Sequence, residues 1–211
     1  MATDLERAAN AVSLPPALAD RMRNVARGID EVHWRLPHRV HKPKGGFVQP
    51  SHTHTLESTL VIPRHTDVLG ASDSHNATVR IVNTALLRYR QTSPPEHQRL
   101  ILGAVARYLV LDPDPSAVLY PGTLGDTIFL MLGPNELTGV DRFLRQADPF
   151  GRFGLQHFFD DTSPSPCATS HRRDWESKVN RPDRALIALL ALGAGDMHAP
   201  ETRLSILWTD H

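Results

Sequence analysis

The chain contains very little cysteine and very little lysine. Its 211 residues include a single cysteine, Cys167, so neither a disulfide framework nor a cysteine-based zinc cluster can form within it. Three lysines, Lys42, Lys44 and Lys178, stand among 23 basic residues, and arginine supplies the rest. Because 23 acidic residues balance the basic ones, the formal net charge is zero, which argues against a whole-molecule attraction to nucleic acid or to a membrane.

Several well-known sequence patterns are missing. No apolar run reaches the length of about 18 residues that predicts a transmembrane helix. Residues 1–30 carry charges and lack the apolar region of a secretory signal, so we expect an intracellular, cytoplasmic protein. The chain also lacks a glycine-rich phosphate loop, a dinucleotide-binding fingerprint, a nucleophile elbow and the zinc-binding helix of metalloproteases.

The clearest helical pattern lies near the start of the chain. Residues 3–12 could form a short amphipathic helix, and residues 16–32 predict a longer one that begins at a pair of prolines. Apolar residues of the longer helix recur at alternating steps of four and three: Leu18, Met22, Val25, Ile29 and Val32. We expect this stripe to be buried inside the chain, and a contact between subunits of a homo-oligomer is the alternative.

The rest of the chain mixes strand-like and helix-like segments. β-branched and apolar residues favour strands at 56–63, 77–90, 117–120, 126–132, 153–159 and 202–209. Helices are predicted at 95–109, after a capping box from Ser93 to Glu96, and from Pro134 to about Ala147. The predicted buried face of the helix at 95–109 consists of Leu100, Ile101, Ala104, Val105, Tyr108 and Leu109. Residues 184–192 fit either a helix or a buried strand.

These segments predict an α+β fold: a single domain over 1–211 with one mixed or antiparallel sheet covered by helices. Within it, we expect a helical N-terminal segment at 1–32, a basic irregular loop at 33–50 and a mixed core at 51–211. The core would be built from the strands at 56–63, 77–90, 126–132 and 202–209, under the helices at 16–32 and 95–109.

A basic, aromatic loop covers residues 33–47. Its cations are Arg35, Arg39, Lys42 and Lys44, and Trp34 and Phe47 lie near them in the sequence. Such a mixture can hold phosphates and stack on bases, so a nucleic-acid or phosphate ligand is one hypothesis. A solvated connecting loop and a contact with an acidic protein partner are the alternatives.

The twelve histidines are the least ordinary feature of the composition, because histidine binds metals and moves protons near neutral pH. His52 and His54 are two residues apart, share one side of an extended chain, and precede Glu57. Nitrogen and oxygen ligands of this kind suit Fe(II), Mn(II), Zn(II) or Ni(II). The stretch GFVQPSHTHTLE resembles the first metal-binding motif of the cupins.

A second pair, His65 and Asp67, follows the predicted strand at 56–63, and His198 and Arg203 lie near the end of the sequence. Together they resemble the motifs of the Fe(II)/2-oxoglutarate-dependent oxygenases, which use a cupin-like double-stranded β-helix. The resemblance implies that His65, Asp67 and His198 hold Fe(II), and that Arg203 binds the carboxylate of 2-oxoglutarate. A competing distal ligand is His171, with Arg181 or Arg184 behind it.

Two classes of function remain from the sequence. One is a metal-dependent enzyme, most specifically a mononuclear non-haem iron oxygenase that acts on a small-molecule substrate. The other is a non-catalytic binding or assembly protein, such as a viral or complex subunit, without a cofactor. In that case the stripe from Leu18 to Val32 and the loop at 33–47 would be the working surfaces, and the partner would be a protein or a nucleic acid.

Overall fold

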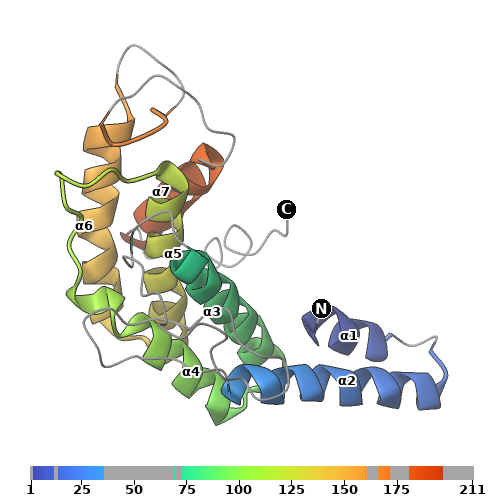
Figure 1. The fold of residues 1–211 in the computed structure, drawn as a ribbon. Helices are drawn as coiled ribbons and strands as arrows, with labels where there is room; N and C mark the ends of the chain where they lie inside the picture. Colours follow the sequence, from blue (N-terminus) through green and yellow to red (C-terminus); the bar gives the residue numbers. More distant parts are fainter. Residues whose placement is uncertain are drawn as a thin grey trace, which may run out of the picture.

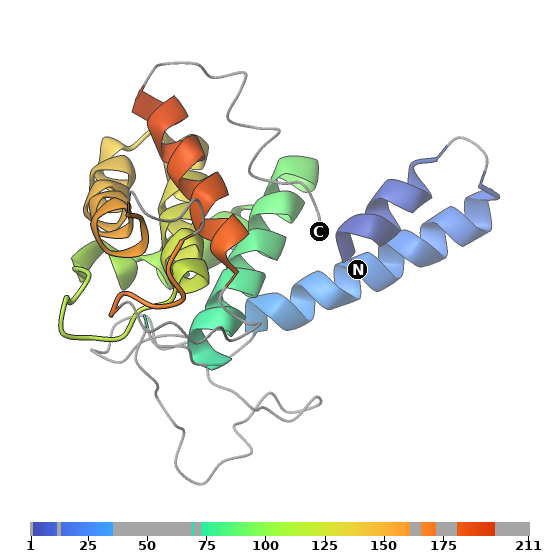
Figure 2. The same cartoon turned by 90° about the horizontal axis from the view of Figure 1, so that it is seen from above.

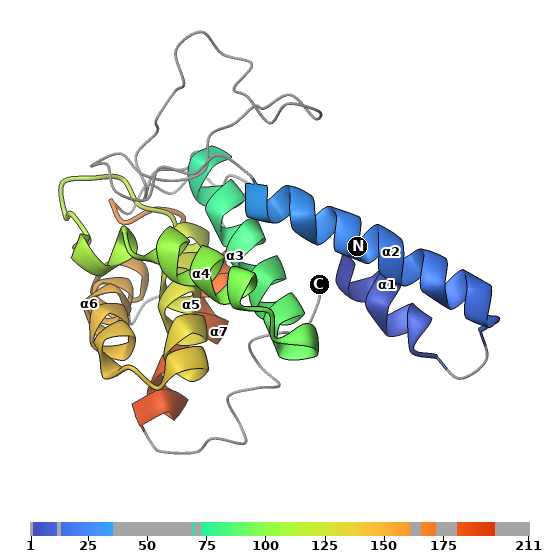
Figure 3. The same cartoon turned by 90° about the horizontal axis from the view of Figure 1, so that it is seen from below.

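A computed structural model describes residues 2–11, 14–35, 69, 73–160, 166–171 and 181–196, and most of these residues are helical (Figure 1). Helices α1 (Ala2–Ala9) and α2 (Pro16–Arg35) lie side by side and extend away from the other helices in all three views (Figures 1, 2 and 3). We call α1 and α2 the arm. The body consists of the remaining elements: α3 (Asp73–Thr92), α4 (Pro95–Val105), the short helix η1 (Tyr108–Val110), α5 (Pro121–Thr138), α6 (Asp141–Phe158) and α7 (Pro182–Asp196).

Helix α5 is the centre of the body. It contacts α3, α4, α6 and α7, and its buried residues lie on all of its sides. The four consecutive residues from Ile128 to Met131 are almost completely buried, which is the pattern of a helix enclosed by others. The helix begins at Pro121, whose fixed φ suits a first helical position. Its last residue, Thr138, is followed by the cap residue Gly139, whose φ of 67° is left-handed.

The predicted α+β fold with a sheet is wrong for the described residues, because no strand occurs among them. The segments predicted as strands at 77–90 and 126–132 lie in α3 and α5, and the one at 153–159 lies in α6 except for its last residue. Residues 117–120 form irregular chain. In α3, the buried side chains of Val79, Val82 and Leu86 recur at the helical period. Their β-branching lowers helix propensity only slightly, and packing of this face against the body decides the conformation.

One predicted helix start and one predicted capping box are also wrong. Pro134 lies inside α5 rather than at the start of a helix, and the next helix, α6, begins at Asp141. Pro134 has no N–H to donate to the Leu130 carbonyl, yet its neighbours are buried on all sides and their packing keeps the turn helical. At α4, Pro94 is the N-cap, and Ser93 has a left-handed φ of 52° and gives no side-chain cap.

The helices predicted at 16–32 and 95–109 are confirmed as α2 and as α4 followed by η1. Leu100, Ile101, Ala104, Val105 and Tyr108 are buried as expected. Residues 184–192, left open between helix and strand, are part of α7. The predicted strands at 56–63 and 202–209 and the loop residues 36–50 lie outside the described residues. Within the described ranges, no helix combines the length and apolar character needed to cross a membrane.

Candidate functional site

The arm buries small side chains. Ala19 and Ala26 of α2 and Ala2 and Ala9 of α1 are all nearly or fully buried, and the two helices are in close contact. Alanine rows let two helices approach closely, and they remove little apolar surface from water compared with leucine or valine. The side of α2 that packs on α1 is therefore the alanine side.

The larger apolar residues of α2 lie beside this packed side, and three of them face solvent. Leu18 is 40% exposed, Val25 54% and Val32 43%, while Met22 and Ile29 are half-buried. The prediction that the stripe is buried inside the chain is thus wrong for Leu18, Val25 and Val32. Each residue of a helix is rotated by about 100° from the next. Val25 therefore points away from the direction in which Ala26 packs. We call Leu18, Met22, Val25, Ile29 and Val32 the apolar row.

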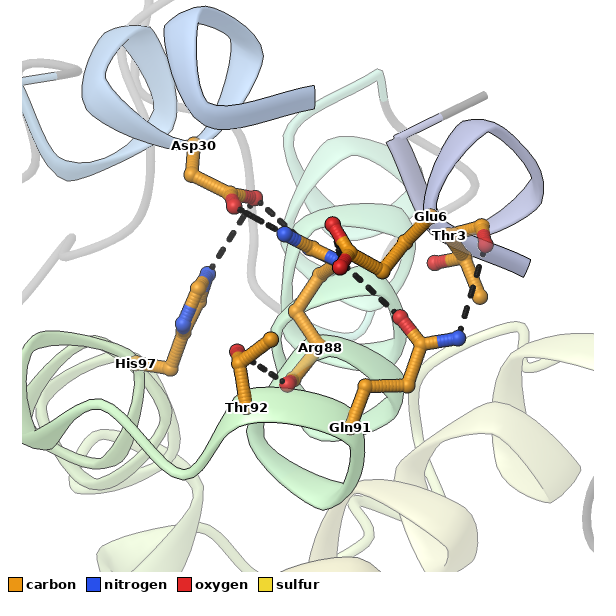
Figure 4. Close-up of polar contacts among 7 residues, drawn as sticks. All are labelled: Thr3, Glu6, Asp30, Arg88, Gln91, Thr92 and His97. Carbon is orange, nitrogen blue, oxygen red and sulfur yellow. Dashed lines mark hydrogen bonds and ion pairs between the residues drawn. The ribbon is translucent and has the colours of Figure 1, made fainter. Parts of the chain in front are cut away.

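A buried ion cluster joins the arm to the body (Figure 4). The guanidinium of Arg88, on α3, donates hydrogen bonds from Nε to both Asp30 carboxylate oxygens at 3.0 Å, and from Nη2 to Oδ2 at 2.6 Å. Asp30 belongs to α2, and its side chain and that of Arg88 are about 95% buried. This two-pronged contact is the strongest geometry available between arginine and a carboxylate.

The cluster continues into α1. Glu6 places its Oε2 3.6 Å from Arg88 Nη1, and that same nitrogen donates a hydrogen bond of 2.9 Å to Gln91 Oε1. Gln91 Nε2 in turn donates to the Thr3 carbonyl at 3.4 Å. Figure 4 shows Arg88 between the carboxylates of Asp30 and Glu6, so a single body residue is paired with both helices of the arm.

His97, on α4, completes the cluster from the other side. Its side chain is 1% exposed, and its Nε2 lies 3.5 Å from Asp30 Oδ1, which is an ion pair when the ring is protonated. Neither ring nitrogen has a hydrogen-bond partner among the described residues. Trp34 of α2 packs edge-on against the ring, with centroids 5.2 Å apart. The end of α2 nearest the body is therefore held by contacts with both α3 and α4.

The charges of the cluster shift two pKa values. Burial alone would raise the pKa of Asp30, but the contacts with His97 and Arg88 together outweigh it, and the pKa lies below its ordinary value of 3.8. The hydrogen bonds to Asp30 are the main reason that the pKa of Arg88 is raised. Asp30 and Arg88 are therefore both ionised across the physiological range, and the pair is a permanent one.

The contacts of this cluster connect the arm to the body. Asp30 and Glu6 belong to the arm, and Arg88 and His97 belong to the body. Among the residues that the structure describes, no group of three His, Cys, Asp or Glu side chains is placed so that it could hold a metal ion. What the cluster does is fix the direction in which the arm leaves the body.

Most residues singled out from the sequence lie outside the described ranges. This applies to the proposed iron ligands His65, Asp67 and His198, to Arg203 for 2-oxoglutarate, and to the loop cations Arg39, Lys42 and Lys44. It applies equally to His52, His54 and Glu57. Arg35 is described and is exposed at the end of α2. The described residues therefore do not test these proposed sites.

The competing ligand His171 is described, and its surroundings are not those of an iron site. It is exposed, and its Nε2 lies 3.2 Å from the Pro115 carbonyl. Arg181 and Arg184, the cations expected behind it, both pair with the buried Asp126 of α5, at 3.0 and 2.7 Å. The guanidinium of Arg184 also lies 3.9 Å from the centroid of the Phe129 ring. Arg184 of α7 and Arg181, the residue before α7, are thus both paired with α5.

The dioxygenase interpretation is wrong. A double-stranded β-helix is made of strands, and the described residues, which include four of the predicted strand segments, contain none. The metal-binding and oxidoreductase assignments rested on that fold, because only its paired strands bring the distant ligands to one point. Because helices stand in place of these strands, the spacing of the proposed ligands in the sequence no longer predicts that they meet at one metal ion.

The sequence did contain one signal for the cluster that was not used. At helical spacing, Arg88 continues the buried positions Ile81 and Ala85 by steps of four and three. A charged residue in an apolar row requires a buried partner, because such residues are almost never buried unpaired. The signal was missed because the segment was interpreted as a strand, in which Arg88 falls in a different row. Nothing comparable marks Asp30 or His97 as its partners.

No protein-family model, curated protein or solved structure matches this chain. The function is therefore inferred from the arm, its joint to the body and its apolar row.

Proposed function

We propose that this chain is a non-catalytic assembly protein that binds a protein partner through the apolar row of its arm. The observation that carries the proposal is the exposure of Leu18, Val25 and Val32 along one line of α2. Single exposed apolar residues are ordinary at a protein surface, but an aligned set on one helix is typical of a contact surface.

The spacing of the row supports a helical partner. Steps of four and three, repeated twice, keep five side chains on one line, which is the arrangement of the seam between two paired helices. The row extends over most of α2, whose 20 residues span about 30 Å. A second helix laid along this line would cover the three exposed side chains and the two half-buried ones at once.

The joint to the body supports the same function. Association is favoured when the binding surface is held in its bound geometry beforehand, since less conformational freedom is then lost. Asp30 lies between Ile29 and Val32 of the row, and its ion pair with Arg88 is buried in the body. The cluster therefore orients the row with respect to the rest of the molecule.

The proposal is tested by measuring whether the row is free in the isolated chain. In a Cys167→Ser background, cysteine is introduced at Val25, which is 54% exposed, or at Ala26, which is fully buried. Each variant is kept at nanomolar protein concentration under native conditions and is reacted with a thiol reagent. We expect the cysteine at 25 to react at nearly the rate of an unfolded peptide, and the cysteine at 26 to react far more slowly. Equal, slow reaction at both sites would show that the chain itself covers the row, and the proposal would fail.

A further inference from the structure

We infer that the partner of the apolar row is a second copy of this chain, paired antiparallel along α2. The inference rests on the proposed function and adds the identity of the partner. An isologous contact needs one surface that complements itself under a twofold axis. In an antiparallel pair centred on Val25, Leu18 of one copy meets Val32 of the other, and Val25 meets its own counterpart, so the three most exposed side chains cover one another.

The charges beside the row are compatible with this pairing. Arg21 lies next to the row on its exposed side, and the antiparallel pair centred on Val25 brings it level with Ile29 of the second copy, beside Gly28. Among the described residues of α2 that flank the row, no two like charges therefore come level with each other, and Gly28 leaves room for the longer arginine side chain. The antiparallel arrangement also sets the two helix dipoles in opposite directions.

The direction of the arm favours the antiparallel pair over a parallel one. The C-terminal end of α2 is joined to the body through Asp30 and Trp34, and its N-terminal end lies away from the body (Figure 3). A parallel pair would bring both bodies to the same end of the contact. In the antiparallel pair the bodies lie at opposite ends, and each arm reaches toward the other molecule.

The size of the surface predicts a dimer that dissociates on dilution. A standard interface uses about 20–30 residues from each partner, and smaller ones are weak or transient. One face of the 20-residue helix α2 supplies fewer than that. We therefore expect mostly monomer at nanomolar concentration and an increasing share of dimer through the micromolar range.

The experiment is sedimentation velocity of the whole chain over this range, for the wild type, Val25→Asp and Val25→Lys. Each variant places two like charges at the twofold axis, so we expect its dissociation constant to rise about 100-fold or more. An equimolar mixture of the two variants should dimerise again, because Asp then meets Lys. Leu155→Asp is the matched control: Leu155 is 59% exposed on α6, and its replacement should leave dimerisation unchanged.

The orientation is tested by cross-linking in the Cys167→Ser background. Leu18→Cys and Val32→Cys should form a disulfide-linked dimer when mixed and oxidised, and neither should do so alone. Cross-linking of Leu18→Cys with itself would overturn the antiparallel pair. A wild type that stays monomeric up to about 100 μM, well above a micromolar dissociation constant, would overturn the second copy as partner. If the cysteine at 25 still reacts rapidly in that monomer, the proposed function survives with a different protein as partner.

Discussion

Arg88 lies between two carboxylates that come from the two helices of the arm, and its side chain is 4% exposed. Removing a guanidinium and a carboxylate from water costs several kcal/mol for each ion, and only close, well-directed contacts offset that cost. The three hydrogen bonds to Asp30 meet this requirement. The cluster therefore fixes the orientation of the arm relative to the body more than it adds to the net free energy of folding.

Replacing Arg88 with methionine should destabilise the protein by about 3–5 kcal/mol, because the carboxylate of Asp30 is then left buried and uncompensated. Denaturant unfolding measures the change. Arg152→Met is the matched control: Arg152 is 79% exposed and pairs with Asp148 on the same helix, so its loss should cost about 0–1 kcal/mol. Equal losses for the two variants would contradict a buried, functional joint.

Acid should weaken the joint in a predictable direction. The pKa of Asp30 is lower in the folded chain than its ordinary value of 3.8, so below that value the unfolded state binds more protons. The contribution of Asp30 is complete above pH 3.8 and is lost as the pH falls through the folded pKa. We expect the difference in unfolding free energy between the wild type and Asp30→Asn to shrink as the pH falls below 3.8. A difference that grows on acidification would contradict this assignment.

At the scale of elements, α5 and α7 approach so closely that one position between them requires glycine. A Cβ built at Gly125 of α5 would lie 2.6 Å from the carbonyl oxygen of Arg184. That oxygen belongs to the main chain, so it cannot rotate away as a side chain could. The same stretch holds the pair between Asp126 and the Arg184 side chain at 2.7 Å. The close approach and the ion pair thus set the position of α7 together.

Gly125→Ala should therefore destabilise the body, by about 1–3 kcal/mol, since the two helices must separate to admit the methyl group. Gly193→Ala on α7 is the control, because a Cβ there meets nothing within 4 Å. In that open position alanine should raise the stability by about 0.5–1 kcal/mol. Thermal and denaturant unfolding of both variants test the pair, and a neutral Gly125→Ala would show that the contact is looser than described.

At the scale of the whole molecule, the described chain is a helical body that holds a two-helix arm. The body has large buried side chains, among them Tyr108, Phe150 and Phe158, whereas the arm buries mainly alanines. Because burial of apolar area is the main source of stability, the body contributes most of the folding free energy and the arm little. An arm of this kind gains apolar burial when a partner helix covers its row, which is the physical basis for the proposed assembly.

Local pattern determined several features of this protein without any structure. The proline start and the apolar spacing of α2 predicted that helix, and the spacing of Leu100, Ile101, Ala104 and Val105 predicted the buried face of α4. Both succeed because helix formation depends on neighbours three and four residues apart, which the sequence displays directly. The single cysteine likewise excluded a disulfide within the chain from composition alone.

Tertiary structure decided the rest. Val79 and Val82 suit a strand in isolation, and they are helical because their face packs against the body, a contact that local preference does not contain. The stripe on α2 was visible, but whether it is buried depends on the direction in which α1 packs, and α1 covers Ala19 and Ala26 instead of Val25. The pairing of Asp30 with Arg88 joins residues 58 positions apart. Such partners become neighbours only after the helices have packed, so the joint and the exposed row could be seen only in the folded chain.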